Sequence, residues 1–357
     1  MFQGSIPALV TPMRADGSVD FEAWDRLLDF HDREGTDGVV VAGTTGESPT
    51  LERGELEELV RRAKARLGRR MPVIAGSGSA STAHSIALSK AAEAAGADGL
   101  LVVTPYYNRP TQEGLYRHFH AIADAVGVPI VLYNVPGRTA CDLLPATIAR
   151  LSGHPRIVAV KEATGDLARA APILRDSRPG FLLLSGDDPT AAELMREGAV
   201  GVISVTANVV PRAMHEVCAA ALAGRPDEAV GLNARLMALH RTLFLEPNPI
   251  PVKWALARMG LIGPGIRLPL TTLSESCQGD LLAALRSCGV AVDGGRGLGG
   301  ARASLARGCR VPFRAASSVR RGGRVVEGAG LEFQLHLNGC TWVRIPPSPP
   351  VQARRPR

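Results

Sequence analysis

Residues 38–76 read GVVVAGTTGESPTLERGELEELVRRAKARLGRRMPVIAG. The stretch begins with the apolar run Gly38–Ala42, continues through a helical pattern at Leu51–Leu67 and ends with a second apolar run, Pro72–Ala75. Both runs are apolar at nearly every position instead of alternating, which is typical of strands buried on both faces of a parallel sheet. Gly68, just past the helical pattern, is a typical C-terminal stop. The stretch therefore predicts one strand–helix–strand unit of a parallel α/β fold.

The same pattern recurs along most of the chain. Further helical patterns lie at Phe21–Glu34, Thr82–Ala95 and Gln112–Ala125, and Gly35 and Gly96 again follow as stops. The eight apolar runs are Ser5–Val10, Gly38–Ala42, Pro72–Ala75, Gly99–Val103, Pro129–Tyr133, Ile157–Val160, Phe181–Leu184 and Val200–Val205. Alternating strands and helices predict an α/β protein with a parallel sheet. Eight repeats favour a closed (β/α)8 TIM barrel over the alternative, an open doubly wound sheet.

Helical stretches continue beyond the eighth apolar run, at about Pro226–Leu245, Pro251–Met259 and Leu273–Cys288. We therefore predict three parts. A catalytic barrel covers residues 1–224, a C-terminal helical appendix covers 225–292, and a tail covers 293–357. The tail is rich in Arg, Gly and Pro and has little periodicity, so we expect it to be disordered.

The position of the charge bears on possible partners. The 357 residues carry a formal net charge of +7, which by itself would suggest a nucleic-acid binder. Residues 293–357, however, hold twelve Arg, no Lys and three acidic residues, so a charge of −2 is left for residues 1–292. A nearly neutral body without a basic stripe predicts no nucleic-acid partner. A non-catalytic binding protein that uses the basic tail stays open as an alternative, and it would require a broken active site.

Composition also limits the compartment and the chemistry. No apolar run approaches the ~20 residues that span a bilayer, so no membrane association is expected. The start of the chain has neither the basic segment nor the apolar stretch of an export signal. The six cysteines show no C-x-x-C spacing, and no His, Asp or Glu group has metal-ligand spacing. We therefore predict a cytoplasmic protein with reduced thiols and no metal.

Two strand ends carry side chains suited to covalent catalysis, because catalytic groups in α/β barrels lie at the carboxyl ends of the strands. Lys161 directly follows the apolar run Ile157–Val160, which predicts that its amine lies inside the mouth of the barrel. Burial disfavours the ammonium, so the neutral amine needed for Schiff-base formation becomes accessible. Tyr133 closes the preceding strand, about 4.8 Å away, where its hydroxyl can shuttle protons. The alternatives are a lysine ion-paired with Glu162 and a tyrosine that only packs in the core.

A glycine-rich loop, Gly43–Glu47, follows the second apolar run. Its glycines permit tight turns, and Thr44 and Thr45 supply hydroxyl and backbone N–H donors that suit a small carboxylate. A phosphate loop is the alternative, but the Gly-Lys-Ser/Thr ending of a P-loop is missing. Ser48 and Pro49 then read as the N-cap and the first residue of the next helix.

Four longer motifs carry a resemblance to a known family. They are Gly43–Ser48, Thr104–Asn108, Tyr133–Arg138 and Lys161–Gly165, which read GTTGES, TPYYN, YNVPGR and KEATG. Together they resemble the dihydrodipicolinate synthases of the pyruvate-dependent Schiff-base aldolase family, over residues 1–292. The resemblance implies a lyase that condenses pyruvate with L-aspartate 4-semialdehyde, in the diaminopimelate route to lysine. It implies no metal and no organic cofactor.

The resemblance also implies roles for individual residues. Pyruvate would form an imine with Lys161 and react as the enamine. The proton relay would consist of Tyr133, Thr44 and Tyr107, with Tyr107 supplied by a neighbouring subunit. The implied substrate contacts are Thr45 for the pyruvate carboxylate, Arg138 for the semialdehyde carboxylate, and Gly186 and Ile203 through their backbones. The family assembles as homotetramers built from two dimers, so the same assembly is expected for this chain.

Related activities stay open as alternatives. N-acetylneuraminate lyases and sugar-acid aldolases share the Schiff-base lysine and the tyrosine, so Lys161 and Tyr133 do not separate these enzymes. Arg138 favours the semialdehyde, because a guanidinium binds a second carboxylate in bidentate fashion and a neutral polyol has none.

The resemblance also bears on feedback inhibition by lysine. In inhibited members, lysine binds at the dimer interface near positions 49, 53, 56, 80, 84 and 106. This chain has Pro49, Arg53, Leu56, Ala80, His84 and Tyr106 at these positions. Few of these side chains accept a hydrogen bond from an ammonium group, so we expect inhibition by lysine to be weak or absent.

Overall fold

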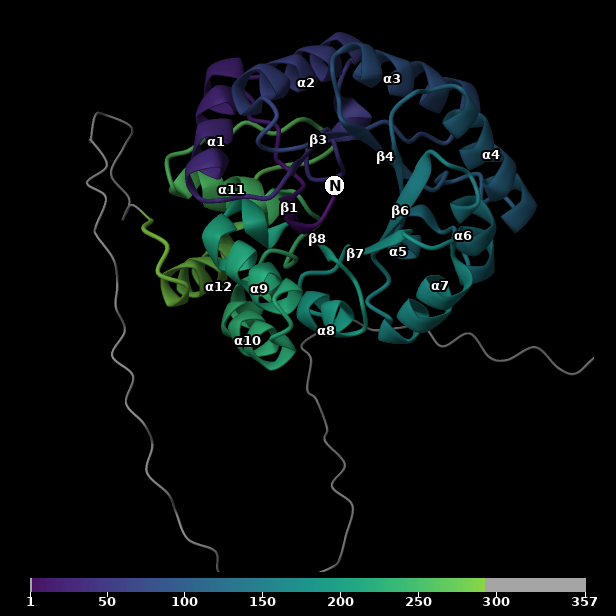
Figure 1. The fold of residues 1–357 in the computed structure, drawn as a ribbon. Helices are drawn as coiled ribbons and strands as arrows, with labels where there is room; N and C mark the ends of the chain where they lie inside the picture. The colour runs from purple at the N-terminus through teal and green to yellow at the C-terminus, as the bar shows by residue number, and fades with distance from the viewer. Residues whose placement is uncertain (1, 293–357) are drawn as a thin grey trace, which may run out of the picture. The chain divides into compact units, whose positions relative to one another are not determined.

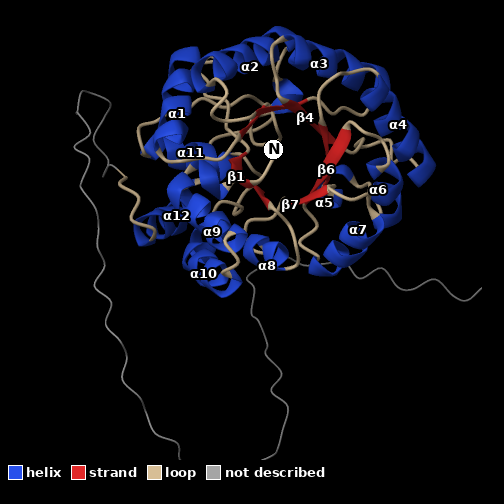
Figure 2. Cartoon of the chain, viewed as in Figure 1, coloured by secondary structure: helices blue, strands red, loops and turns tan. Residues whose placement is uncertain are grey.

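The computed structural model describes residues 2–292, and within them eight parallel strands form a nearly closed barrel (Figures 1 and 2). The strands are β1 Gly4–Pro7, β2 Val39–Val41, β3 Val73–Gly76, β4 Gly99–Val103, β5 Ile130–Asn134, β6 Ile157–Glu162, β7 Leu182–Ser185 and β8 Gly201–Ser204. The sheet runs from β1 through β8 to β2, and a bridge between Ala8 and Val40 brings its two ends together. The predicted TIM-barrel class is confirmed.

Helices surround the barrel as an outer ring (Figure 2). They are α1 Phe21–Arg33, α2 Arg53–Leu67, α3 Thr82–Ala94, α4 Gln112–Asp124, α5 Pro136–Thr139, α6 Pro145–Ser152, α7 Ala170–Asp176, α8 Ala191–Arg196 and α9 Pro211–Leu222. Three more helices follow, α10 Pro226–Thr242, α11 Ile250–Arg258 and α12 Glu275–Ser287. Short 3-10 turns lie at η1 Ser48–Thr50, η2 Leu167–Arg169 and η3 Thr206–Asn208. None of the helices in residues 2–292 is both long and apolar enough to cross a membrane.

Two apolar layers explain why polar and apolar residues do not alternate along the strands. One face of each strand packs against the helices, and the other fills the barrel interior with side chains such as Ile6, Val40 and Leu101. Phe2 is completely buried in the interior layer. A Cβ atom on Gly99, the first residue of β4, would lie only 2.5 Å from Phe2 Cζ. Phe2 therefore fills the amino-terminal end of the barrel, which leaves the carboxyl end for substrates.

The second strand–helix connection differs from its prediction. Ser48 is not an N-cap: it lies in the 3-10 turn η1, which Glu47 precedes in a left-handed conformation with φ of 59°. Helix α2 begins only at Arg53, where Glu52 and Glu55 form a capping box. Reciprocal side-chain bonds of this kind satisfy two backbone N–H groups that would otherwise have no partner, which a proline after Ser48 does not achieve.

The predicted tail, residues 293–357, lies outside the described residues. The predicted division at residue 224 between barrel and appendix stays a prediction. Within the described part, α10 packs along α9 and α8, and α12 packs against α10 and α11. The helices after the barrel are thus continuous with its outer ring.

Candidate active site

Lys161 and Tyr133 face each other inside the barrel. They are direct partners in the pairing of β5 with β6, so both side chains point to the same side of the sheet. The Lys161 Nζ atom lies 4.3 Å from the centroid of the Tyr133 ring. Both side chains are buried, with 5% of Lys161 and 6% of Tyr133 exposed. An amine and a phenol are therefore held together in a sheltered position, as imine chemistry requires.

The neighbouring carboxylate, Glu162, points the other way. Successive strand residues face opposite sides of the sheet, so Glu162 lies on the outer face of β6. Its carboxylate accepts hydrogen bonds from Arg169 Nε at 3.1 Å and from the Thr164 N–H at 3.0 Å. The alternative of a Lys161–Glu162 ion pair is wrong. Within residues 2–292 no carboxylate pairs with the Lys161 amine, which leaves that amine available as a nucleophile.

The strands beside Lys161 leave little room around it. A Cβ atom on Gly186 would lie 2.9 Å from Lys161 Cε and 2.5 Å from Ala163 Cβ, so only glycine fits beside this lysine. Ile203 on β8 is buried in the same interior layer as Tyr133. Gly186 and Ile203 therefore occupy strand ends on the lysine side of the barrel.

Side chains far along the sequence, which were not predicted as site residues, contact the loop Gly43–Glu47. Asn248 Nδ2 donates to Thr45 Oγ1 at 2.9 Å, and both side chains are buried. Because Thr45 Oγ1 accepts this bond, its own hydroxyl hydrogen is left to donate elsewhere. Thr45 can therefore give a hydrogen bond to an anion in the barrel mouth.

Glu47, at the end of the same loop, forms a buried ion pair. Lys253 on α11 donates to its carboxylate, and the backbone N–H of Arg267 donates to it at 3.0 Å. Burial lowers the pKa of Lys253, and the charge of Glu47 opposes this shift. Lys253, only 4% exposed, is thus a second buried lysine, but one committed to an ion pair.

Thr44 and Arg138 line one cavity of about 420 Å³. Arg138 lies on the short helix α5, and its guanidinium is exposed and without an ion pair among the described residues. The lining includes neither Lys161 nor Tyr133.

Tyr107 does not pack on its own barrel. Its side chain is 93% exposed, and its backbone has φ of 72°, in the left-handed region that is strained for a tyrosine. Within one chain the structure does not bring Tyr107 to Lys161.

A model of the dihydrodipicolinate synthetase family matches residues 1–288. The chain belongs to the dihydrodipicolinate synthetase family. The resemblance predicted from the four sequence motifs is therefore confirmed.

Other dihydrodipicolinate synthases are similar to this chain both in sequence and in structure. A protein of Stutzerimonas stutzeri named 4-hydroxy-tetrahydrodipicolinate synthase is 58% identical over 290 residues, 81% of this chain and 99% of the relative. The chloride-inhibited dihydrodipicolinate synthase of Acinetobacter baumannii, solved with pyruvate, is 50% identical with a TM-score of 0.80, covering 82% of this chain and all of the other. The Aquifex aeolicus dihydrodipicolinate synthase is 43% identical with the same TM-score, covering 82% of this chain and all of the other.

This family member also carries a histidine cluster that sequence spacing did not predict. His120 and Asp124 on α4 lie with His154, 30 residues from Asp124, so that their ligand atoms fall within 4.8 Å of one another. The Arg156 N–H donates to His154 Nδ1 at 3.1 Å, which places the proton of the neutral ring on Nε2, facing Asp124. No lone pair on Nε2 is then available to a metal. Asp124 ends α4 and Arg156 precedes β6, so the cluster lies at the end of the barrel opposite Lys161.

Proposed function

We propose that the protein is a 4-hydroxy-tetrahydrodipicolinate synthase, a lyase that condenses pyruvate with L-aspartate 4-semialdehyde in the diaminopimelate route to lysine. The observation that carries the proposal is the Lys161 amine, buried in the barrel, free of an ion pair among the described residues and 4.3 Å from the Tyr133 ring. Membership of the dihydrodipicolinate synthetase family supports it.

The proposed reaction begins at the Lys161 amine, which attacks the ketone carbon of pyruvate. The carbinolamine loses water to form an imine, and loss of a proton from the methyl group gives the enamine. The enamine carbon attacks the aldehyde of the semialdehyde, and the amino group of the adduct then displaces Lys161 as the ring closes. Each step moves a proton, and Tyr133 beside the amine is the group proposed to carry it, with Thr44 and Tyr107 extending the relay.

The two carboxylates of the substrates need separate partners. Thr45 is proposed to bind the carboxylate of pyruvate, because its hydroxyl hydrogen is left free by the bond that it accepts from Asn248. The backbones at Gly186 and Ile203 are proposed to line the same position. Arg138 is proposed to bind the carboxylate of the semialdehyde. Its guanidinium, exposed and without an ion pair within residues 2–292, favours this substrate over the neutral chain of a sugar.

Tyr107 supports a proposed assembly. A strained and exposed tyrosine is costly to keep in a lone chain, and a side chain that is 93% exposed does not pack beside its own buried Lys161. We propose that it completes the site of a second copy, in a homotetramer of two dimers. No metal or organic cofactor is proposed, because the imine supplies the electron sink. The cytoplasmic location stays a prediction.

Borohydride trapping tests the function. Reduction in the presence of pyruvate is expected to attach pyruvate to Lys161, which peptide mass mapping would locate, because only an imine is reducible there. Lys161→Ala should abolish the adduct and lower the condensation rate by at least about 10³-fold. Lys90→Arg, at an exposed position of α3, is the control and should behave like the unchanged protein. Pyruvate on another lysine, or on none, would refute the mechanism.

A further inference from the structure

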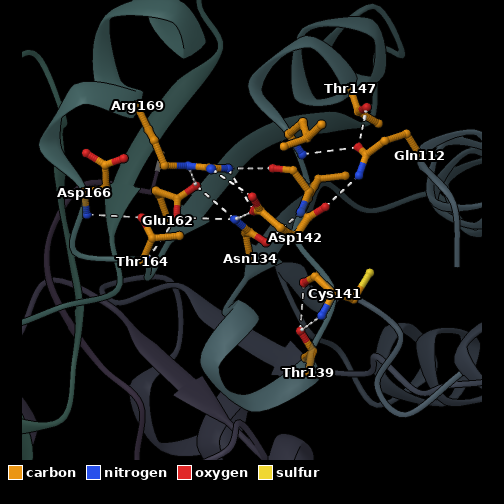
Figure 3. A network of polar contacts seen from close by, with 12 residues as sticks. Gln112, Asn134, Thr139, Cys141, Asp142, Thr147, Glu162, Thr164, Asp166 and Arg169 are labelled. Carbon is orange, nitrogen blue, oxygen red and sulfur yellow. Dashed lines mark hydrogen bonds and ion pairs between the residues drawn. The ribbon is translucent and has the colours of Figure 1, made fainter. Parts of the chain in front are cut away.

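A polar network lies on the outer face of the two strands that carry Lys161 and Tyr133 (Figure 3). Asn134 and Glu162 are partners in the β5–β6 pairing, one position beyond the Tyr133–Lys161 pair. Asn134 Nδ2 donates to Glu162 Oε2 at 3.2 Å and to Asp142 Oδ1 at 2.9 Å. Two carboxylates are therefore gathered around one amide, where their like charges repel each other.

Arg169 neutralises both carboxylates. Its Nε donates to Glu162 at 3.1 Å, and its two terminal nitrogens donate to the two oxygens of Asp142 at 3.0 and 3.1 Å. A further bond reaches the Leu143 carbonyl at 2.8 Å. The side chain of Arg169 is 13% exposed and that of Glu162 is 2% exposed, so solvent screens this ion pair little, whereas the Asp142 side chain is 36% exposed. Figure 3 shows Arg169, from the segment after β6, reaching across to Asp142, in the segment after β5.

The segment after β5 is held at several points by this network. Leu143 N donates to Asn134 Oδ1 at 2.9 Å, and Gln112 Nε2 donates to the Asp142 carbonyl at 2.7 Å. This segment begins with α5, which carries Arg138. The network thus joins the strand end that bears the amine to the segment that bears the guanidinium.

We propose that Arg169 is a positioning residue that sets the Lys161–Tyr133 pair and the Arg138 segment relative to each other. It does so through Glu162 on one side and Asp142 on the other, without touching substrate. The inference rests on the proposed function, because it assigns Lys161 to pyruvate and Arg138 to the semialdehyde. A planar guanidinium is needed for this geometry, since a lysine ammonium cannot engage Glu162 and both oxygens of Asp142 together.

Arg169→Lys tests the proposal, because it keeps the positive charge and removes the planar guanidinium. We expect kcat/KM for the semialdehyde to fall about tenfold to hundredfold, as misplacement of a reacting group by ~1 Å does, while circular dichroism stays unchanged. The matched control is Arg175→Lys on α7, where the exposed arginine pairs, among the residues that the structure describes, only with its neighbour Asp176. Its kinetics should equal those of the unchanged protein.

Two further variants separate positioning from folding. Asp142→Asn should raise KM for the semialdehyde and leave the rate of borohydride trapping with pyruvate unchanged, whereas Glu162→Gln should slow trapping. Partial unfolding would instead lower kcat and the yield of trapped enzyme by the same factor. If Arg169→Lys does not fold, the double variant Arg169→Met with Glu162→Gln removes both charges of the Arg169–Glu162 ion pair. Its folded fraction should still show the lower kcat/KM for the semialdehyde.

The outcomes distinguish this proposal from the proposed function. Normal kinetics in folded Arg169→Lys, or in the double variant, would overturn the positioning role. The proposed function would still stand if pyruvate were trapped on Lys161 in the unchanged protein. Equal loss of kcat and trapping in all variants would also overturn the positioning role. Trapping on a lysine other than Lys161 would overturn both.

Discussion

The Arg138 side chain makes no hydrogen bond or ion pair with another residue of the described part of the chain. It lies on the four-residue helix α5, and its guanidinium makes no ion pair with the described residues. A charged group that the fold does not use can be removed without loss of stability, because surface substitutions usually change stability by less than about 0.5 kcal/mol. Changes in activity at this position therefore report on the substrate.

Arg138→Leu should weaken use of the semialdehyde and spare the imine. A hydrogen bond to a charged group contributes about 1.5–3 kcal/mol, so kcat/KM for the semialdehyde should fall roughly tenfold to hundredfold. Borohydride trapping with pyruvate should proceed at its normal rate, which is the internal control. The measurement is initial rate against semialdehyde at saturating pyruvate. Unchanged semialdehyde kinetics would move the assignment toward a sugar-acid aldolase.

At the scale of single residues, the sequence predicted the Lys161–Tyr133 encounter because both residues close neighbouring apolar strands. It did not predict that Glu162 faces away, because a strand buried on both faces has no polar alternation to show which side is which. It also missed Asn248 and Lys253. Their partners Thr45 and Glu47 are 203 and 206 positions away, and only the closed barrel brings them together.

At the scale of elements, glycines made helix ends more predictable than helix starts. Gly35, Gly68 and Gly96 all adopt positive φ just after α1, α2 and α3, as a C-terminal stop requires. The short helix α5 and the turn η1 were missed, because three or four residues are too few to show a period. Both lie at strand ends beside the candidate site, so the sequence predicted the scaffold better than the loops that carry chemistry.

Two outer helices contain buried histidines that should make stability depend on pH. Burial lowers the pKa of His31 on α1 to about 3 and that of His118 on α4 to about 4, from an ordinary value of 6.5. Below pH 6.5 the unfolded chain gains protons that the folded chain does not. Each histidine should therefore reduce stability by up to about 1.4 kcal/mol per pH unit as the pH falls from 6.5 toward these lowered values.

Urea unfolding at pH 7 and pH 5 measures this effect, and the midpoint should be lower at pH 5. Carboxylates with lowered pKa, such as Glu55 beside Arg267, lose their contribution only as the pH falls below their ordinary value of 4.5. They do not account for a change above pH 5. His31→Gln, which removes one titrating ring, should reduce the difference between the two midpoints. Equal midpoints at both pH values, or no reduction in the variant, would contradict the assignment.

At the scale of the whole molecule, one cavity reaches from the candidate site to the outer ring. The volume of this cavity is about 420 Å³, and besides Thr44 and Arg138 its wall includes residues of α2 and α3. Five of the six positions implied in lysine feedback lie on this wall, namely Pro49, Arg53, Leu56, His84 and Tyr106. Ala80 does not line the cavity, and its carbonyl accepts a bond from Asn108 Nδ2 at 2.9 Å. A ligand bound in this cavity could therefore influence the substrate positions directly.

The chemistry of that wall does not suit lysine, which presents two ammonium groups and one carboxylate. Leu56 is buried and cannot accept a hydrogen bond. Glu52 lines the cavity, but its carboxylate already accepts the N–H of Glu55 in the capping box of α2. Arg53 pairs with Glu57 at 2.8 Å and adds a positive charge that repels ammonium groups. The wall therefore offers a cation to the carboxylate of lysine, and Glu52, which is already bonded at the start of α2, is the one carboxylate among its lining residues.

L-Lysine should accordingly inhibit this protein only weakly. An ammonium left without a partner costs at least about 1–3 kcal/mol, which corresponds to a tenfold or greater loss of affinity. We expect half-inhibition only above about 1 mM, measured as initial rate against L-lysine at subsaturating pyruvate. Leu56→His, which places an acceptor on the cavity wall, should strengthen inhibition if missing acceptors are the cause. Half-inhibition of the unchanged protein well below a millimolar would show that the wall binds ammonium groups through Glu52 or Tyr106 after all.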